Sequence, residues 1–131
     1  MYVLDTNTLI YYFKGIGKVA SQLLNHPPRD IAIPSVVLYE LEVGIAKSQS
    51  PEKRRQQLDT LTGLITVLPL GTREAKSAAM IRASLEAAGS SIGPMDTLIA
   101  GISMAHQGIL VTHNLKEFSR VDDLQLTDWY A

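Results

Sequence analysis

The stretch YVLDTN, residues 2–7, decides the fold, because in it an apolar run ends directly in a carboxylate. Residues 2–4 are apolar enough to form a short strand that is buried on both faces, as strands of parallel sheets are. Asp5 then stands at the carboxyl end of this strand. Its side chain, or that of Thr6 or Asn7, can cap a helix that we expect over residues 6–13.

The same alternation of short apolar strands and helices continues along the chain. Further strands are predicted over residues 31–33, 65–68, 109–111 and 124–126. Further helices are predicted over residues 19–24, 36–47, 51–61, 72–89 and 94–107, with one turn at 116–118 and with Ser35, Ser50 and Thr72 as N-terminal caps. The pattern indicates one α/β domain over residues 1–131, with parallel strands covered by helices. Ligands bind beyond the carboxyl ends of such strands, where Asp5 and residues 112–114 are expected.

The composition fits a small cytoplasmic domain. The chain has 131 residues, 46% of them hydrophobic, and a formal net charge of −1. The absence of cysteine excludes disulfides, zinc–thiolate sites and thiol nucleophiles. No apolar run approaches the roughly 20 residues of a membrane span and no signal peptide is apparent, so we expect no membrane contact. The net charge alone argues against a nucleic-acid partner, which usually selects a basic surface.

Glu40 is the acidic residue whose predicted position is least compatible with a solvent-exposed side chain. On a helical wheel it lies within an apolar face, whereas Glu42 points away from that face. The predicted face consists of Val36, Val37, Val43 and Gly44. A glutamate within a buried face is costly unless a partner compensates for its charge. The alternative is a position at the edge of the face, with an arginine as partner.

Two further acids stand near the ends of predicted elements. Asp96 lies in the first turn of a helix, where an acid favours the macrodipole, and Glu117 follows the last buried strand. Each acid has an ordinary explanation when taken alone, but their convergence is unusual in a chain of which only 19% is charged. A hard divalent cation such as Mg²⁺ or Mn²⁺ explains it, because these ions prefer oxygen ligands. Such an ion can activate water for a phosphoryl displacement.

Other catalytic arrangements are weaker. Residues 15–17 lack the spacing of a phosphate-binding loop, and no nucleophile-elbow motif accompanies a serine. His26 and His106 lack metal-ligand spacing, and so does His113, although His113 lies beside the predicted site. Arg82 is predicted either as a surface arginine or as a contact for acids or phosphate.

Four motifs occur in order along the chain: LDTN at residues 4–7, PSVVLYELEVG at 34–44, GPMDTLIAG at 93–101 and VTHNLKEFSRV at 111–121. Together they resemble the PIN-domain ribonucleases and, more narrowly, the VapC-type toxins of bacterial toxin–antitoxin pairs. The match covers nearly the whole chain, which ends with LQLTDWYA. The resemblance implies a three-layer α/β/α sandwich with a short, mostly parallel central sheet, a homodimer and a small antitoxin partner.

The resemblance also implies a metal site, position by position. The residues that match the metal-binding acids of the family are Asp5, Glu40 and Asp96. Many relatives carry an aspartate where this chain has Asn114, which brings a carbonyl oxygen but no charge, so Glu117 is the alternative source of a fourth carboxylate. The implied hydrogen-bonding residues around the metal or the substrate are Thr6, Asn7 and Thr112.

The sequence therefore predicts a Mg²⁺- or Mn²⁺-dependent endoribonuclease that cleaves structured RNA, with tRNA expected by family analogy. Without the four acids the rest of the chain is net basic, which suits a phosphodiester substrate. Two alternatives stay open: a metal-dependent DNA nuclease or phosphatase that uses the same site, and a non-catalytic interaction module whose acids are helix caps. The apolar run at residues 9–13 is a candidate contact for a second chain.

Overall fold

The computed structural model describes residues 1–131 and contains a five-stranded sheet in the order β3-β2-β1-β4-β5. Its strands are β1 (Tyr2–Leu4), β2 (Ile31–Pro34), β3 (Thr66–Leu68), β4 (Ile109–Val111) and β5 (Gln125–Thr127). Every neighbouring pair is parallel, so the sheet is wholly rather than mostly parallel. The predicted α/β class is confirmed, and each predicted strand is present to within about one residue.

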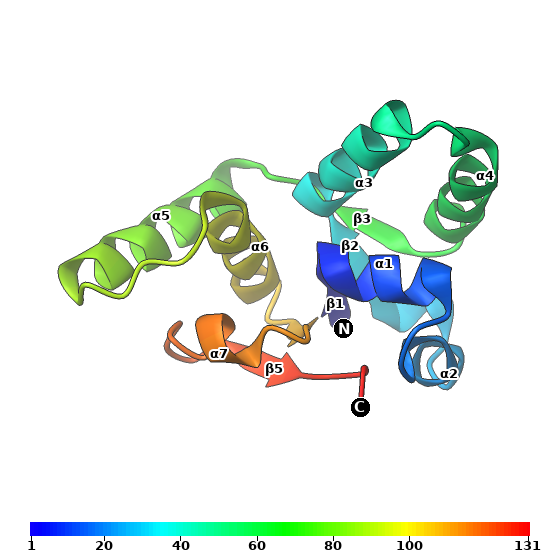
Figure 1. The fold of residues 1–131 in the computed structure, drawn as a ribbon. Helices are drawn as coiled ribbons and strands as arrows, with labels where there is room; N and C mark the ends of the chain where they lie inside the picture. Colours follow the sequence, from blue (N-terminus) through cyan, green and yellow to red (C-terminus); the bar gives the residue numbers. More distant parts are fainter.

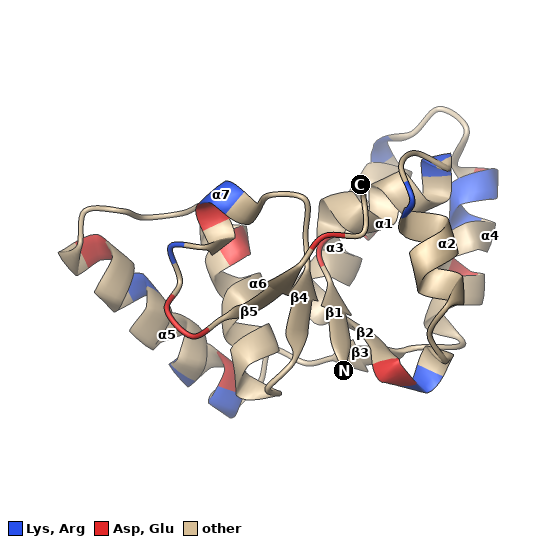
Figure 2. Cartoon of the chain, turned by 90° about the horizontal axis from the view of Figure 1, so that it is seen from below, with Lys and Arg blue, Asp and Glu red and all other residues tan.

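Helices flank this sheet on both sides (Figures 1 and 2). They are α1 (Thr6–Lys14), α2 (Val19–Leu24), α3 (Ser35–Lys47), α4 (Pro51–Thr62), α5 (Thr72–Ala87), α6 (Pro94–Ala105) and α7 (Leu115–Phe118), with a 3₁₀ turn at Pro28–Asp30. Figure 2 shows α5 and α6 on one side of the sheet and α1, α2 and α4 on the other. No helix combines the length and the apolar character that crossing a membrane requires.

Of the three predicted helix caps, the one at Ser50 is confirmed in its position, and those at Ser35 and Thr72 are wrong. Ser35 and Thr72 are the first residues of their helices, and Ser50 occupies the cap position without a side-chain hydrogen bond. At the start of α5 the Glu74 carboxylate instead accepts a hydrogen bond from the Gly71 N–H at 3.0 Å. At α5 the Gly71 N–H is therefore satisfied by a side chain from within the first turn of the helix.

The chain changes its direction across the sheet at β1. β2 and β3 lie on one side of β1, and β4 and β5 lie on the other. Such a switch point opens a crevice beyond the carboxyl ends of the two strands that flank it, here β1 and β4. The N–H of Asp5 donates to the carbonyl of Val111 at 3.2 Å, and the Thr8 hydroxyl donates to the same carbonyl at 3.1 Å. The fold thus joins the two strand ends at which site residues were expected.

The core is centred on these strands. Val3, Leu4, Leu110 and Val111 are fully buried, as strands covered on both faces require. In the apolar run at residues 9–13, Leu9 and Phe13 belong to the core, and the three residues between them are half-buried. The most exposed large apolar side chains lie elsewhere, at Leu24, Tyr39, Leu64 and Met80.

Gly101 provides a test of how closely α6 packs on α5. A methyl group at this position would lie 2.5 Å from Cβ of Ala78 and 2.6 Å from its Cα and N. We expect Gly101→Ala to lower the free energy of unfolding by about 1–3 kcal/mol in urea denaturation, because backbone atoms must move. Gly44→Ala in α3 is the matched control, since nothing lies within 4 Å of the added methyl. It should raise stability by roughly 0.5–1 kcal/mol, and equal effects of the two substitutions would contradict the packing.

Candidate active site

Asp5 is both a helix cap and a buried acid at the carboxyl end of β1. Its side chain is 5% exposed, and Oδ1 accepts a hydrogen bond from the Thr8 N–H at 2.9 Å, which caps α1. Burial raises the pKa of the Asp5 carboxyl, whereas hydrogen bonds from Thr112 and Thr8 oppose the rise. The capping explanation is therefore confirmed, but the cap uses only one oxygen of the carboxylate.

Glu40 is oriented toward the same crevice by Thr6. The Thr6 hydroxyl donates to Oε1 of Glu40 at 2.6 Å, across 34 positions of sequence. Glu40 is half-buried, and no arginine pairs with it. Because Thr6 follows Asp5 directly, one short stretch of chain positions two carboxylates.

The buried face of α3 differs from the one predicted. It consists of Val36, Val37, Leu41 and Ile45. Val43 and Gly44 are not buried, so the predicted face was wrong at these two positions, because the core lies along residues 37, 41 and 45. Glu40 stands at the margin of the face. Glu42 does point away, as predicted, and its carboxylate forms an ion pair with Arg55 of α4, in which the Nη1–Oε2 distance is 2.8 Å.

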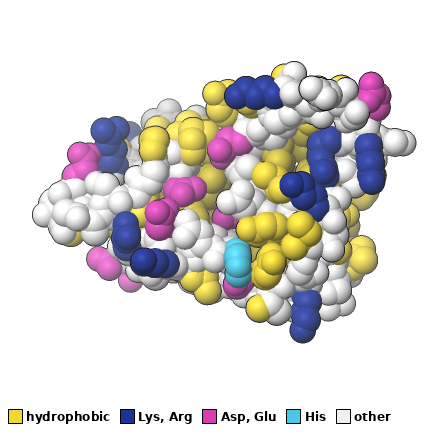
Figure 3. Space-filling view, in the orientation of Figure 1, with side chains coloured by type: hydrophobic (Ala, Val, Ile, Leu, Met, Phe, Trp, Pro, Cys, Tyr) yellow, Lys and Arg dark blue, Asp and Glu magenta, His cyan; other side chains and the backbone are white.

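Asp96 lies near three other acids, whose charges affect its pKa. It lies half-buried in the first turn of α6, and its pKa is raised to about 6 by burial and by the negative charges of Asp5, Glu117 and Glu40, in that order. These four residues are called the acidic cluster below. Figure 3 shows acidic side chains gathered in the middle of one face, with Lys and Arg on both flanks and a histidine beside them.

Asn114 and Glu117 act together at the end of β4. The Asn114 amide Nδ2 donates to Oε2 of Glu117 at 3.0 Å, while its own backbone N–H donates to the Thr112 hydroxyl at 3.0 Å. This arrangement leaves the Asn114 carbonyl oxygen as its remaining acceptor. Asn114 therefore holds the carboxylate of Glu117 in its orientation.

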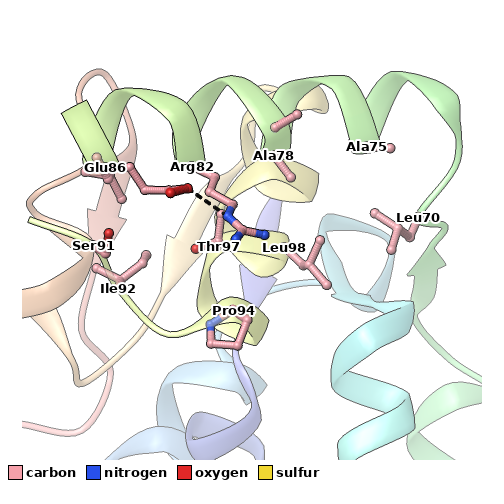
Figure 4. A pocket seen from close by; sticks show the side chains of 12 residues that line it. Leu70, Ala75, Ala78, Arg82, Glu86, Ser91, Ile92, Pro94, Thr97 and Leu98 are labelled. Atoms are coloured by element: carbon pink, nitrogen blue, oxygen red, sulfur yellow. Dashed lines mark hydrogen bonds and ion pairs between the residues drawn. The ribbon is translucent and has the colours of Figure 1, made fainter.

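Two of the predicted residues, Asn7 and Arg82, are exposed. Asn7 is exposed at the start of α1. Arg82 pairs with Glu86 at 2.9 Å, is 74% exposed, and lines a hollow of about 590 Å³ between α5 and the start of α6 (Figure 4). It is not among the charges that shift the pKa of Asp96. Arg82 is thus a peripheral cation in this structure.

Asp128 is a site residue that the sequence analysis missed. It follows β5 directly, and its charge contributes to the raised pKa of Asp5. Its Oδ2 lies 2.8 Å from Nδ1 of His113. Asp128, like Asp5, is an acid at the carboxyl end of a strand. The predicted strand ended at residue 126, which placed Thr127 between the strand and Asp128, whereas the observed β5 ends at Thr127.

The acidic cluster fits a hard cation in its donor chemistry. All of its ligating atoms are carboxylate oxygens, and the pKa of Asp96 is raised first by burial and then by the negative charges of Asp5, Glu117 and Glu40, which a divalent cation would offset. In this structure no three Asp, Glu or His side chains are close enough together to coordinate one metal ion. Binding would therefore require small side-chain rotations.

Comparison with known proteins gives independent evidence. The family model of the PIN domain matches residues 2–124. The tRNA(fMet)-specific endonuclease VapC of Salmonella typhimurium is 33% identical, with 98% of this chain and 97% of that protein covered. The chain belongs to the VapC ribonucleases of the PIN-domain family. Another member, ribonuclease VapC2 of Rickettsia felis, is 32% identical over 98% of each chain.

Solved VapC-containing structures have the same fold. DNA-bound VapBC from Salmonella typhimurium matches with a TM-score of 0.91 and 32% identity, covering 98% of this chain and 97% of the other. VapBC2 from Rickettsia felis, bound to a DNA fragment from its promoter, matches with a TM-score of 0.87 and 33% identity over 98% of each chain. These likenesses confirm the predicted VapC resemblance and the PIN-like architecture.

The raised pKa of Asp96 predicts a pH-dependent stability. Because its pKa is about 6 in the folded protein against a usual 3.8, the folded state binds this proton more tightly than the unfolded state. The contribution of Asp96 to stability therefore falls as the pH rises between these two values. In EDTA, Asp96→Asn should raise Tm at about pH 7.5 but have little effect at about pH 4.

The matched control for this experiment is Asp122→Asn, since Asp122 is exposed and forms no ion pair. Its Tm should follow that of the unsubstituted protein at both pH values. A stabilisation by Asp96→Asn that is equal at the two pH values would show that like-charge repulsion is not its cause.

Proposed function

We propose that this protein is a Mg²⁺- or Mn²⁺-dependent endoribonuclease that acts as the toxin of a toxin–antitoxin pair. Ribonuclease chemistry follows from its place among the VapC proteins. The observation that carries the metal dependence is the acidic cluster at the carboxyl edge of the sheet, in which the pKa of Asp96 is raised to about 6. Carboxyl groups with raised pKa values that lie near other acids are typical of sites that work with a bound cation.

Three residues of the acidic cluster, Asp5, Glu40 and Asp96, would hold the metal. The ion supplies a bound water of lowered pKa and neutralises charge on the phosphate. Hydrogen bonds from Thr8 to Asp5 and from Thr6 to Glu40 orient two of the three carboxylates in advance. Such outer partners fix the direction of a ligand and strengthen its binding.

Asn114 and Glu117 are proposed to act on the attacking water or on a second ion. The Glu117 carboxylate can accept a proton, and the Asn114 amide holds it in place. Thr112 in turn fixes the backbone of Asn114. Hydrolysis directed in this way would leave 5′-phosphate and 3′-hydroxyl ends on the RNA. Asn7 and Arg82, both exposed, are proposed to contact the substrate rather than the metal.

Basic side chains lie on both flanks of the acidic cluster. Those of α4 are Lys53, Arg54 and Arg55, and those of α5 are Arg73, Lys76 and Arg82. α4 and α5 stand at opposite ends of the molecule (Figure 1), so the residues form two groups rather than one. A polyanion that crosses the cluster would meet positive charge on either side, which supports a nucleic-acid substrate.

The substrate and the partners are proposed from the relatives. The Salmonella typhimurium protein is named a tRNA(fMet)-specific endonuclease, and we propose a structured RNA, tRNA in particular, for this chain. Several of the similar structures are VapBC complexes of toxin and antitoxin. A small antitoxin partner, a homodimer and a cytoplasmic location are therefore part of the proposal.

Cleavage of RNA tests the proposed function. Addition of EDTA, or any one of Asp5→Asn, Glu40→Gln and Asp96→Asn, should lower the cleavage rate by at least about 100-fold, because each weakens or removes the metal site. Glu42→Gln is the matched control, since Glu42 lies on the same helix but pairs with Arg55. It should cleave RNA at the unsubstituted rate.

Parallel assays on DNA and on small phosphate esters separate the rival functions. If DNA or a small phosphate ester is cleaved faster than RNA, the protein is a DNA nuclease or a phosphatase and the proposed ribonuclease function is wrong. RNA cleavage that survives EDTA and all three substitutions would leave the acids with a structural role only.

Thr6 allows a finer test of how Glu40 is held. Thr6→Val is nearly isosteric but removes the donor to Glu40, so RNA cleavage should fall roughly 10- to 100-fold at limiting Mn²⁺ and recover in part at high Mn²⁺. Thr6→Ser keeps the hydroxyl and should retain most of the activity. Equal activities of the two variants would show that the 2.6 Å hydrogen bond does not support the site.

A further inference from the structure

Beside the acidic cluster lies a group of aromatic side chains to which the proposed chemistry assigns no role. The rings of His113 and Tyr130 are stacked, with centroids 4.2 Å apart and planes 23° apart. Tyr11 packs edge-on against Tyr130 with centroids 4.9 Å apart. Asp128 holds the imidazole through Nδ1 at 2.8 Å. These four residues, from α1, the end of β4 and the end of β5, are called the aromatic platform.

The platform presents one open ring surface. One face of the His113 imidazole is covered by Tyr130, and its Nδ1 is taken by Asp128. The side chain is nevertheless 44% exposed, whereas Asp128 is 18% exposed. Tyr11 also stands edge-on to the His113 ring, with centroids 6.0 Å apart. Because Tyr11 is closer to Tyr130, at 4.9 Å, it lies beside the stacked pair and not across the ring face opposite to Tyr130. The ring is fixed in orientation although much of its surface faces solvent.

The platform borders the acidic cluster. His113 lies two residues beyond Val111, whose carbonyl accepts the hydrogen bond from the Asp5 N–H. It also directly precedes Asn114, which holds Glu117. The charge of Asp128, which holds His113, also contributes to the raised pKa of Asp5, so the aromatic platform lies within electrostatic reach of the acidic cluster.

A purely structural role explains the platform less well. The ends of β4 and β5 are already joined by the hydrogen bond from the Thr112 N–H to the Thr127 carbonyl at 2.9 Å. The hydrogen bond between His113 and Asp128 adds a second connection between the same strand ends, and a single hydrogen bond contributes only modestly to net stability. What the pairing does provide is a fixed, planar and solvent-facing ring.

We propose that the aromatic platform is a nucleobase subsite, in which the open face of His113 stacks on an RNA base adjacent to the scissile phosphate. Every base has a π-face, so an aromatic ring can stack on any of the four bases. Such stacking positions the RNA strand without selecting a particular base sequence. Tyr130 and Asp128 are positioning residues that hold the imidazole. The proposal rests on the proposed ribonuclease function and names the part of the substrate that a second region of the same site would bind.

The experiment uses the shortest RNA hairpin that the unsubstituted protein cleaves, labelled with fluorescein, with its cut position mapped. Binding is measured by fluorescence anisotropy in an Asp96→Asn background, so that the RNA stays intact. His113→Ala should weaken binding by roughly 5- to 150-fold, which is the usual range for loss of one base–aromatic stack. His113→Phe, which keeps a ring, should retain most of the affinity, while His113→Gln, which keeps a polar group near Asp128 but has no ring, should behave like His113→Ala.

A set of hairpins with one abasic nucleotide each locates the subsite. The protein with His113 should lose affinity when the base beside the cut is absent, and His113→Ala should show no further loss at that position. The idea is overturned if His113→Ala binds the intact hairpin as tightly as the His113 protein. It is equally overturned if phenylalanine fails to substitute for histidine, or if His113→Ala and the abasic changes act independently at every position.

Two controls separate this inference from the function on which it rests. If the unsubstituted protein cleaves no RNA, the proposed function itself fails and the subsite fails with it. If RNA is cleaved, Tm and Mn²⁺ affinity of His113→Ala should match those of the unsubstituted protein. A loss of either would assign a structural or metal-binding role to His113 and overturn the base-stacking role.

Discussion

The burial of acidic side chains near one another is the constraint on which the rest of this structure depends. Asp5, Glu40, Asp96 and Glu117 come from four separate segments of the chain, and the pKa of Asp96 rises to about 6 because this carboxyl is partly buried and faces the negative charges of the other three. Such an arrangement opposes folding and must be offset by other interactions. The fully buried residues of β1 and β4, and the hydrogen bond that joins Asp5 to the end of β4, provide that support. Functional sites typically lower the folding stability locally, and the rest of the protein compensates for this loss.

Asp5 shows that a capping role and a functional role need not exclude each other. The cap on α1 uses Oδ1 and thereby fixes the direction in which the carboxylate faces the crevice. Thr6, the next residue, binds Glu40. The start of a single helix therefore places two acids, so the short stretch at residues 5–6 contributes more to the geometry of the site than any other segment.

Local sequence patterns were sufficient for the architecture. The strands were predictable because each is a short apolar run between helix-forming segments, and Asp5 and Asp96 were predictable because each stands at an element end. Helix caps were less predictable, since Glu74 reaches back to Gly71 and competes with the nearer Thr72. The face of α3 was partly misassigned, because the core contacts Leu41 and Ile45 rather than Val43 and Gly44. The contact of Asn114 with Glu117 depends on the orientation of two neighbouring side chains. The contacts of Thr6 with Glu40 and of His113 with Asp128 join distant segments. They depend on tertiary packing, and no local sequence pattern encodes that packing.

Calorimetric titration with Mn²⁺ at about pH 6, repeated in buffers of different ionisation enthalpy, tests most directly whether the acidic cluster is a metal site. Because the pKa of Asp96 is about 6, part of this carboxyl is protonated there, and a bound cation must displace the proton. We expect saturable binding with release of a fraction of a proton, and loss of that proton release in Asp96→Asn. Absence of saturable binding, or identical binding and proton release in the two proteins, would contradict a metal site at the acidic cluster.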